Sequence, residues 1–390
     1  MKVTVKDLDI NNKNVIIRVD YNVPIKDNKI VDDTRIVNSL ETLKYVLDKC
    51  NKMILISHLG RIKTTEDKDN NSLELVSKRL SELLGIDVLF IKELDFNKIK
   101  DIINNNPNKV ILLENSRFYD LDGKLESECS EELSKNYASL GDVFINDAFG
   151  TIHRAHASNV GIGNILPSGI GFLVEKELKE LEYLNDPERP YTVILGGSKV
   201  SDKIKVINNL VTKCDKLIIG GAMAFTFLKA KGLNTGKSLV EDDYTSLCTE
   251  LLNKYSDKII LPLDVITSNE IGSESINKNI NELENDDIGL DLGYNTISII
   301  KEILSNSKTV FWNGPLGYYE IDKYFNATKS ILEYLSNNNI KTILGGGDIV
   351  ACATKLNLED KIYHISTGGG ATLEYLEGKS LPGLEVIKNK

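Results

Sequence analysis

Short runs of β-branched residues alternate with amphipathic stretches of helical length from one end of the 390-residue chain to the other. Strands separated by helix-length segments indicate βαβ units, which build parallel sheets. The expected strands are Asn14–Val19, Met53–Ile56, Val110–Leu113, Val143–Ile145, Tyr191–Leu195, Lys216–Ile219, Lys258–Leu261, Thr309–Trp312 and Thr342–Leu344. The expected helices between them include Arg35–Leu47, Leu73–Leu84, Glu131–Leu140, Lys203–Thr212 and Lys323–Leu335. The pattern therefore predicts an α/β fold.

A segment rich in Gly and Pro interrupts this alternation near the middle of the chain. Residues 161–171 read GIGNILPSGIG, which is typical of a loop or a hinge, and a charged helical pattern follows at Glu175–Leu184. The length is sufficient for two domains that each bury a core. We therefore expect two doubly wound, Rossmann-like parallel-sheet domains joined by a hinge near residues 165–190. Ligands of such folds bind outside the carboxyl ends of the strands.

The charge balance argues against several classes of partner. The chain has 47 Lys plus Arg and 57 Asp plus Glu, which gives a net charge of −10, and both halves are acidic. We therefore expect no nucleic-acid or anionic-membrane surface. No run of 18 apolar residues and no secretory signal is evident, so no membrane association is expected. The five Cys residues are far apart without a CxxC pair, which favours reduced thiols in a cytoplasmic protein.

Several familiar catalytic and nucleotide-binding motifs are absent. The chain has no GxxxxGK[ST] and no GxGxxG, because Gly161-Ile-Gly163 continues to Leu166. The kinase HRD and DFG elements, GxSxG and HExxH are also missing. A Walker-type NTPase, a protein kinase, an α/β-hydrolase and a zincin are therefore not expected.

All seven Arg residues lie before residue 190, and four of them fall beside strand ends. Their contexts are DDTR (32–35), SHLGR (57–61), ENSR (114–117) and NDAFGTIHRAH (146–156). The planar guanidinium suits bidentate contact with carboxylate or phosphate. In a chain that otherwise uses Lys, the four residues Arg35, Arg61, Arg117 and Arg154 predict a site for one small, multiply charged anion.

Plainer interpretations of these segments stay open at this point. A solvated surface residue is the less favoured interpretation of Arg35. A structural His beside a loop charge explains His58 and Arg61 as well as an anion site does. Metal binding by His153 and His156 is the weaker alternative to anion binding by Arg154 with its flanking His residues, because two His residues three apart need further ligands and a helical frame. Arg18 alternates with Asp20 on an expected strand and is interpreted as a local ion pair, while Arg79 and Arg189 are interpreted as surface residues.

The carboxyl-terminal half carries Gly-rich segments after its strands. In GGSKVSDK (196–203), Lys199 and Lys203 are four apart and are expected on one helix face. Like charges at that spacing repel each other unless a phosphate lies between them. The Gly345–Gly347 run permits close backbone approach to phosphate, and Asp348 after it suits a hard cation such as Mg²⁺. With TGGG (367–370) and WNGPLG (312–317), these segments predict a nucleotide polyphosphate site.

Eight segments together resemble the phosphoglycerate kinase family. They are RVDYNVP (18–24), DDTRI (32–36), SHLGR (57–61), NDAFGTIHRAHAS (146–158), GGSKVSDKI (196–204), WNGPLG (312–317), GGGD (345–348) and STGGGATLE (366–374). The resemblance runs from residue 18 to about 379 in family order. It implies a cytoplasmic, monomeric glycolytic phosphotransferase that exchanges a phosphoryl group between 1,3-bisphosphoglycerate and ADP, giving 3-phosphoglycerate and ATP, with Mg²⁺.

The resemblance also implies that the two domains bind different substrates. Residues 1–168, with a returning tail at 380–390, are expected to form the phosphoglycerate-binding domain, and residues 169–379 the nucleotide-binding domain. The implied substrate residues are Asp20, Tyr21, Asn22, Arg35, His58, Leu59, Gly60, Arg61, Arg117 and Arg154. The implied nucleotide residues are Lys199, Lys203, Gly220, Gly221, Asn313, Pro315, Glu320, Gly346, Gly347, Asp348 and Ile349.

Among these, Arg35, Lys199, Gly346 and Gly369 are the implied catalytic group, and Asp348 is the implied metal ligand. Ile349 stands where the family commonly has Thr or Ser, which removes a hydroxyl but keeps the backbone N–H. Two other functions remain as alternatives. A two-domain anion-binding protein would explain the Arg residues but not the Gly-rich segments. A nicotinamide dehydrogenase would share the fold class, but the dinucleotide fingerprint is missing.

Overall fold

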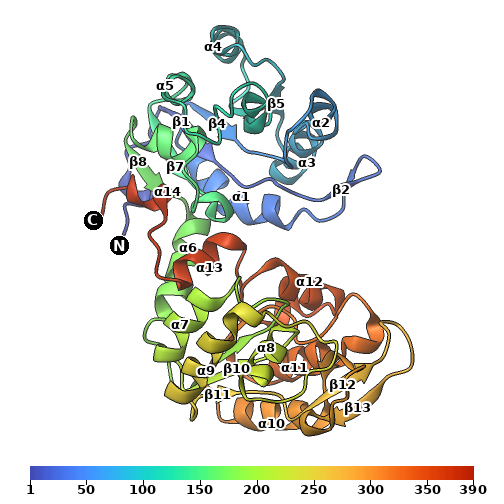
Figure 1. Cartoon of the computed structure of the whole chain (residues 1–390). Coiled ribbons are helices and arrows are strands. Elements are labelled where there is room, and N and C mark those ends of the chain that lie inside the picture. The colour runs from blue at the N-terminus through green and yellow to red at the C-terminus, as the bar shows by residue number, and fades with distance from the viewer. The chain divides into compact units, whose positions relative to one another are not determined.

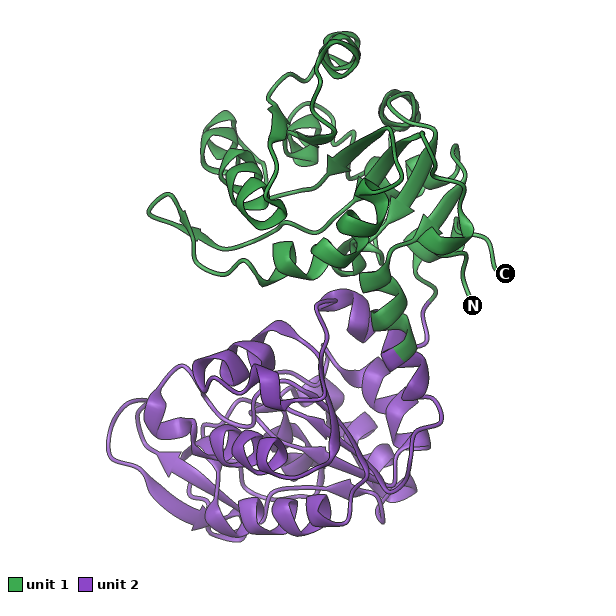
Figure 2. Ribbon diagram, turned by 180° about the vertical axis from the view of Figure 1, so that it is seen from behind, with its two compact units in different colours: residues 1–179, 380–390 green, residues 180–379 purple.

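The structure, a computed structural model, describes all residues Met1–Lys390 and divides into two compact units. Unit 1 comprises Met1–Lys179 and Ser380–Lys390, and unit 2 comprises Glu180–Lys379 (Figure 2). Each unit has its own central parallel sheet with helices packed on it (Figure 1).

The sheet of unit 1 has six strands in the order β5-β6-β4-β1-β7-β8, and every neighbouring pair is parallel. The strands are β1 (Asn14–Arg18), β4 (Lys52–Ile56), β5 (Val88–Ile91), β6 (Val110–Leu113), β7 (Val143–Asn146) and β8 (Ser168–Ile170). A separate two-stranded hairpin pairs β2 (Ile25–Lys26) with β3 (Lys29–Ile30). The fold class expected from the sequence is confirmed in this unit.

Helices cover both faces of this sheet, because successive strand side chains point to opposite sides. Val15 and Ile17 of β1 belong to one buried cluster with side chains of α1 (Thr34–Leu47) and α3 (Glu74–Leu84). Ile16 belongs to the other, with α4 (Phe96–Asn105) and α5 (Glu131–Ala138). The remaining helices of the unit are α2 (Thr65–Asn70) and α14 (Pro382–Glu385).

The main sheet of unit 2 is also six-stranded and parallel, in the order β11-β10-β9-β15-β16-β17. Its strands are β9 (Tyr191–Leu195), β10 (Lys216–Ile219), β11 (Ile259–Ile260), β15 (Thr309–Asn313), β16 (Lys341–Leu344) and β17 (His364–Ile365). A second, antiparallel sheet joins β12 (Asp264–Ser268) to β13 (Ile276–Asn279) and β14 (Ile288–Leu292). This second sheet was not expected from the sequence.

The helices of unit 2 again pack on the parallel sheet. They are α7 (Ile204–Lys213), α8 (Met223–Ala230), α9 (Thr245–Lys254), α10 (Tyr294–Ser305), α11 (Asn326–Asn337), α12 (Gly347–Lys355) and α13 (Gly370–Leu376). One buried cluster unites Ile194 of β9 and Trp312 of β15 with apolar side chains of α10, α11 and α12. The indole N–H of the buried Trp312 donates to the Gly314 carbonyl at 2.8 Å, and this hydrogen bond stabilises the turn after β15.

Helix α6 (Phe172–Tyr183) runs across the boundary between the two units. Its first N–H groups are capped in unit 1, where the Asp147 carboxylate accepts from Leu173 N at 3.0 Å and the Thr42 hydroxyl accepts from Phe172 N at 2.9 Å. In unit 2, the Tyr183 hydroxyl lies 2.9 Å from that of Thr309. The cap from Asp147 explains why the helix begins before Glu175, where the charged pattern alone placed its start.

The sequence prediction for residues 161–171 was partly wrong. Ser168–Ile170 is not loop but strand β8, which pairs with β7 at the edge of the sheet. The carboxyl-terminal tail packs in unit 1, where Gly383 N donates to the Ile152 carbonyl at 2.9 Å. No helix in the structure has the length and apolar character that crossing a membrane requires. All five Cys are free thiols, as expected.

Candidate active site

A cavity of about 800 Å³ in unit 1 has a strongly cationic lining. Three of the predicted substrate residues line it, namely Arg61, Arg117 and Arg154, and each follows a strand of the parallel sheet. Lys63 and Lys124 add two further cations that the sequence interpretation did not single out. Parallel strands bring their carboxyl ends to one edge, which is why Arg residues far apart in the chain meet here.

Asp20 and Arg35 form an ion pair beside the amino terminus of α1. Asp20 is 7% exposed and follows β1, and Arg35 is the second residue of the helix. The cap is supplied from outside the helix, because Asp32 Oδ1 accepts from Thr34 N at 2.9 Å. Arg35 is thus held by Asp20 through one guanidinium nitrogen, and its other N–H groups remain available for a ligand.

Asn22 and Gly60 join two loops at the same edge of the sheet. The Asn22 side-chain oxygen accepts a hydrogen bond from Gly60 N at 2.9 Å, and the Arg117 guanidinium donates to the Gly60 carbonyl. Gly60 has φ +61°, a conformation that favours glycine, and a Cβ there would displace the Asn71 side chain.

Two predicted substrate residues have side chains that point into the core. Tyr21 is wholly buried, its hydroxyl lies 3.0 Å from that of Ser39, and burial raises its pKa above the usual range. Leu59 is 4% exposed and belongs to the same buried cluster. These residues can meet a ligand only through their backbone.

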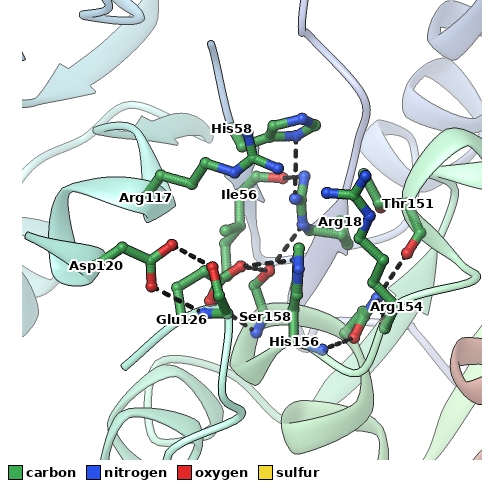
Figure 3. A network of polar contacts seen from close by, with 12 residues as sticks. Arg18, Ile56, His58, Arg117, Asp120, Glu126, Thr151, Arg154, His156 and Ser158 are labelled. Atoms are coloured by element: carbon green, nitrogen blue, oxygen red, sulfur yellow. Dashed lines mark hydrogen bonds and ion pairs between the residues drawn. The ribbon is translucent and has the colours of Figure 1, made fainter. Parts of the chain in front are cut away.

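Arg18 lies at the centre of a buried polar network (Figure 3). The expected ion pair between Arg18 and Asp20 is wrong, because Asp20 pairs with Arg35. Arg18 instead donates to the Ser158 hydroxyl at 2.8 Å and contacts His58 Nδ1 at 3.3 Å. Ser158 in turn donates to the buried Glu126 carboxylate.

The histidines around this network are held in the neutral state. Burial, then Arg18 and Arg117, keeps the pKa of His58 well below its usual range. The same causes lower the pKa of His156 to about 3. Arg154 Nε donates to His153 Nε2 at 3.1 Å, and no group of His, Cys, Asp or Glu in the chain has the arrangement of a metal cluster. The weak metal interpretation of His153 and His156 is therefore not supported.

In unit 2, the segment Gly196–Lys203 precedes α7 and is not its first turn. The expectation that Lys199 and Lys203 share a helix face was therefore wrong, since α7 begins at Ile204. Lys199 is exposed, whereas Lys203 is half-buried and its amine donates to the Asn313 side-chain oxygen. Burial lowers the pKa of Lys203, while Asp202 and Asp348 act in the opposite direction.

Asn313 links the end of β15 to the loop before α12. Its amide nitrogen donates to the Gly345 carbonyl, and its oxygen accepts from Lys203. Gly346 has φ +107° and precedes α12, where Asp348 lies exposed in the first turn. The side chain of Ile349 is wholly buried in the core. A Thr or Ser side chain at this position would be buried in the same way, so Ile349 does not remove a hydroxyl from the surface of the site.

A second cavity, of about 340 Å³, lies beside these loops within unit 2. Among the predicted nucleotide residues, Gly221, Pro315, Glu320 and Asp348 line it. Gly220 lies directly behind, where a Cβ would meet Leu316 at 2.4 Å. Gly369 precedes α13 with φ +52° and is not part of the lining.

Sequence reasoning missed the apolar and aromatic walls of this cavity. They are Phe225, Leu239, Ile271, Ile288, Leu290, Tyr318 and Tyr319. Tyr318 and Tyr319 directly follow the WNGPLG segment, which was the one available signal. The Tyr319 hydroxyl donates to Asp348 Oδ1 at 3.3 Å, and burial raises the pKa of this tyrosine to about 12.

Comparisons of the sequence and of the fold with known proteins point to one family. The family model described as phosphoglycerate kinase matches residues 5–379. The phosphoglycerate kinases of Fusobacterium nucleatum and Enterococcus faecalis are 52% and 50% identical to the chain, and each match covers 100% of both proteins. The crystal structure titled phosphoglycerate kinase from Pyrococcus horikoshii aligns with TM-score 0.83 and 29% identity over 98% of both chains.

The structure of phosphoglycerate kinase from Coxiella burnetii aligns with a TM-score of 0.89 and 36% identity. That match covers 99% of this chain and 98% of the other. With the family model spanning nearly the whole length, the chain belongs to the phosphoglycerate kinase family.

Proposed function

We propose that this enzyme transfers a phosphoryl group between 1,3-bisphosphoglycerate and ADP, giving 3-phosphoglycerate and ATP in glycolysis. The observation that carries the proposal is the separation of two anion sites in a chain of this family. Arg side chains line the cavity of unit 1. Asp348 and Gly-rich turns line the cavity of unit 2, and Lys203 lies next to Gly197 of that lining. An acid with a phosphate ester suits the first, and a nucleotide suits the second.

The substrate acid is assigned to unit 1. Arg61, Arg117 and Arg154 provide forked donors for its phosphate and carboxylate groups. The same edge of the sheet carries Asp20, Asn22 and Arg35. The loops that surround these side chains contain the backbone of Tyr21, Leu59 and Gly60. His58, which is neutral, adds one N–H donor.

The nucleotide is assigned to unit 2. The N–H groups of Gly347, Asp348 and Ile349 have no partner within α12 and suit phosphate oxygens at a helix amino terminus. Lys199 and Lys203 supply positive charge, Asn313 positions Lys203, and the Gly220–Gly221 turn with Pro315 and Glu320 borders the nucleoside. We propose residues 169–379 for this role and residues 1–168 with 380–390 for the other, although residues 169–179 pack in unit 1.

Mg²⁺ fits the donor set at Asp348. This carboxylate is exposed beside the phosphate loop, and Mg²⁺ is usually bound by one or two carboxylates together with nucleotide phosphates. When bound, the ion would neutralise charge on the nucleotide phosphates. We further propose that the enzyme acts as a monomer in the cytoplasm, as is usual for the family.

The chemistry asks for cations and positioning, and no general base is needed. In the direction of ATP use, the nucleophile is a carboxylate that is ionised at neutral pH. The lowered pKa values of His58 and His156 agree with this, because neither ring gains a proton near neutrality. Arg35, Lys199 and the backbone near Gly346 and Gly369 stabilise charge on the transferred group. Because the two sites are in different units, we propose closure about residues 165–190, which excludes water during transfer.

The deciding experiment is a coupled assay of ADP formation from ATP and 3-phosphoglycerate, with and without Mg²⁺. We expect turnover that requires both substrates and the metal. Binding of 3-phosphoglycerate without ADP formation would identify an anion-binding protein. Titration of NADH fluorescence tests the dehydrogenase alternative, and we expect no saturable change.

Replacement of Arg61 by Ala is expected to raise KM for 3-phosphoglycerate by about 10- to 100-fold, because one charge-assisted hydrogen-bonding group is lost. KM for ATP should change little, because Arg61 lies in unit 1. Steady-state kinetics with each substrate varied in turn measures both values. An equal rise in the two KM values would remove Arg61 from the substrate site.

Replacement of Tyr319 by Phe removes only the hydroxyl that donates to Asp348. We expect the Mg²⁺ concentration for half-maximal rate to rise by about 2- to 10-fold, as for one neutral hydrogen bond. Calorimetry should show weaker ATP binding with Mg²⁺ present and unchanged binding in EDTA.

Tyr318→Phe is the matched control, because Tyr318 lines the same cavity without a hydrogen bond to Asp348. The two variants should differ in metal dependence. An identical metal response would show that the Tyr319 hydroxyl does not orient Asp348.

A further inference from the structure

The buried network around Arg18 has a fixed direction of hydrogen bonding. Arg18, Glu126 and Ser158 are wholly buried, and His58 is 5% exposed. Arg18, Glu126 and Ser158 were not expected in the site, and the proposed reaction assigns them no role. Figure 3 shows them as one connected group. Arg18 is the last residue of β1, His58 follows β4, Glu126 lies between β6 and α5, and Ser158 follows β7.

The donors can be assigned along the whole chain of contacts. Glu126 Oε2 accepts from Ser158 N at 3.1 Å, and Oε1 accepts the Ser158 hydroxyl proton. Since its own proton points to Glu126, the Ser158 oxygen accepts from Arg18 Nε at 2.8 Å. Arg18 Nη1 donates to the Val19 carbonyl at 2.6 Å, which leaves Nη2 directed at His58.

This assignment determines the tautomer of His58. A guanidinium has five N–H donors and no acceptor. His58 Nδ1, which lies 3.3 Å from Arg18 Nη2, must therefore be the unprotonated nitrogen of a neutral ring. The proton is on Nε2. The alternative tautomer would set two N–H donors against each other inside the protein.

His58 Nε2 faces outward. No hydrogen-bond partner for it is present within the chain, and it is not one of the buried polar atoms that lack a partner. The small exposed part of His58 therefore includes this nitrogen. The ring therefore presents an N–H donor at the surface of unit 1.

Glu126 is the counter-ion that stabilises the charge of the buried Arg18. Its charge, and then that of Asp20, offsets the cost of burying the guanidinium. An uncompensated charge at this depth would be strongly unfavourable. Ser158 connects the two groups without direct contact between them, and its hydroxyl and the Val19 carbonyl together orient the Arg18 fork.

We propose that Glu126, Ser158 and Arg18 form a positioning relay that locks His58 in the Nε2–H tautomer, so that His58 is a permanent hydrogen-bond donor to the acidic substrate. The relay itself follows from contacts within unit 1. Its link to the substrate rests on the proposed function. Glu126 and Ser158 do not contact the substrate and act through Arg18.

The direct test is ¹⁵N NMR of the full-length enzyme labelled at His. The chain has only four His, and His58→Gln identifies the His58 signals by their loss. We expect a protonated Nε2 and an unprotonated Nδ1 between about pH 5.5 and 8.5. A protonated Nδ1, or titration within this range, would overturn the proposal. This measurement needs no activity, so it stays decisive even if the proposed reaction is not observed.

Ser158→Ala removes the connecting hydroxyl and leaves the other side chains in place. We expect a mixture of His58 tautomers and a rise of about 3- to 10-fold in KM for 3-phosphoglycerate, with smaller changes in kcat and in KM for ATP. Ser158→Thr retains the hydroxyl and should restore the single tautomer. A lowered melting temperature with unchanged tautomer and KM would show a merely structural role and overturn the proposal.

Glu126→Gln provides the second variant, since it retains an acceptor oxygen and removes the charge. We expect the Nε2–H tautomer to persist, because Ser158 can still donate to the amide oxygen, but with a lower melting temperature. A loss of the tautomer in Glu126→Gln and not in Ser158→Ala would contradict the proposed order of the relay.

Discussion

Arg35→Ala is expected to lower kcat by about 100-fold or more, because a cation that stabilises charge on the transferred phosphoryl group is lost. Asp20 holds the guanidinium through one nitrogen, so several N–H donors remain free for the ligand. The side chain is 35% exposed, as expected for a group that must reach a ligand. Steady-state kinetics in both directions measures the effect, and nucleotide affinity should change far less.

Two controls separate this loss from general damage. Arg35→Lys keeps the charge and loses the fork, so an intermediate kcat is expected. Arg79→Ala removes another Arg of unit 1 that bonds a carboxylate, here Asp33 at 2.8 Å, and it should leave kcat unchanged. If Arg35→Ala retained near wild-type kcat, the catalytic assignment of Arg35 would be wrong.

The parallel strands were the most predictable part of the fold. The bounds of β6, β9 and β10 agree with the sequence prediction residue for residue. Their short apolar runs are almost entirely buried, and polar or Gly residues end them abruptly. Helix termini were less predictable, since distant groups such as the Asp147 carboxylate decide where α6 begins.

Strand β5 was missed although Val88–Ile91 is a plain apolar run, whereas two other missed elements carry weak local signals. Strand β8 has three residues in a Gly- and Pro-rich segment, and only its pairing with β7 makes it a strand. The sheet of β12, β13 and β14 is small and antiparallel, and the exposed residues of β13 give no apolar run. Tertiary pairing outweighs local pattern in both cases.

Some residues of the candidate site could be predicted from the sequence, and others could not. The three Arg residues that line the cavity of unit 1 could be found because each follows a strand, and a parallel sheet aligns those ends, whereas Lys63 and Lys124 were missed. The role of Arg18 could not be found, because Glu126 and Ser158 are 108 and 140 residues away in sequence. Lys199 and Lys203 were placed on a helix by spacing alone, and the structure begins α7 after them.

The glycine before α12 should tolerate no side chain. Gly346 has φ +107°, where L-residues are strained by about 1–3 kcal/mol. A Cβ there would also lie 2.4 Å from the Asn313 amide nitrogen, so Asn313 must move. Because Asn313 also accepts from Lys203, the displacement reaches the cation proposed to bind the phosphates. Gly346→Ala is therefore expected to lower kcat/KM for the nucleotide by about 100-fold or more, as for misplaced catalytic groups.

The matched control is Gly232→Ala, which has the same kind of backbone strain without a neighbour. Gly232 has φ +80°, and a Cβ there would meet no atom within 4 Å. It should lower the melting temperature and leave the kinetics unchanged, which separates strain from displacement of Asn313. Thermal melts and kinetics of both variants make the comparison. If Gly346→Ala lost stability as Gly232→Ala does but kept its kcat/KM, then the link from Gly346 through Asn313 to Lys203 would have no part in nucleotide use.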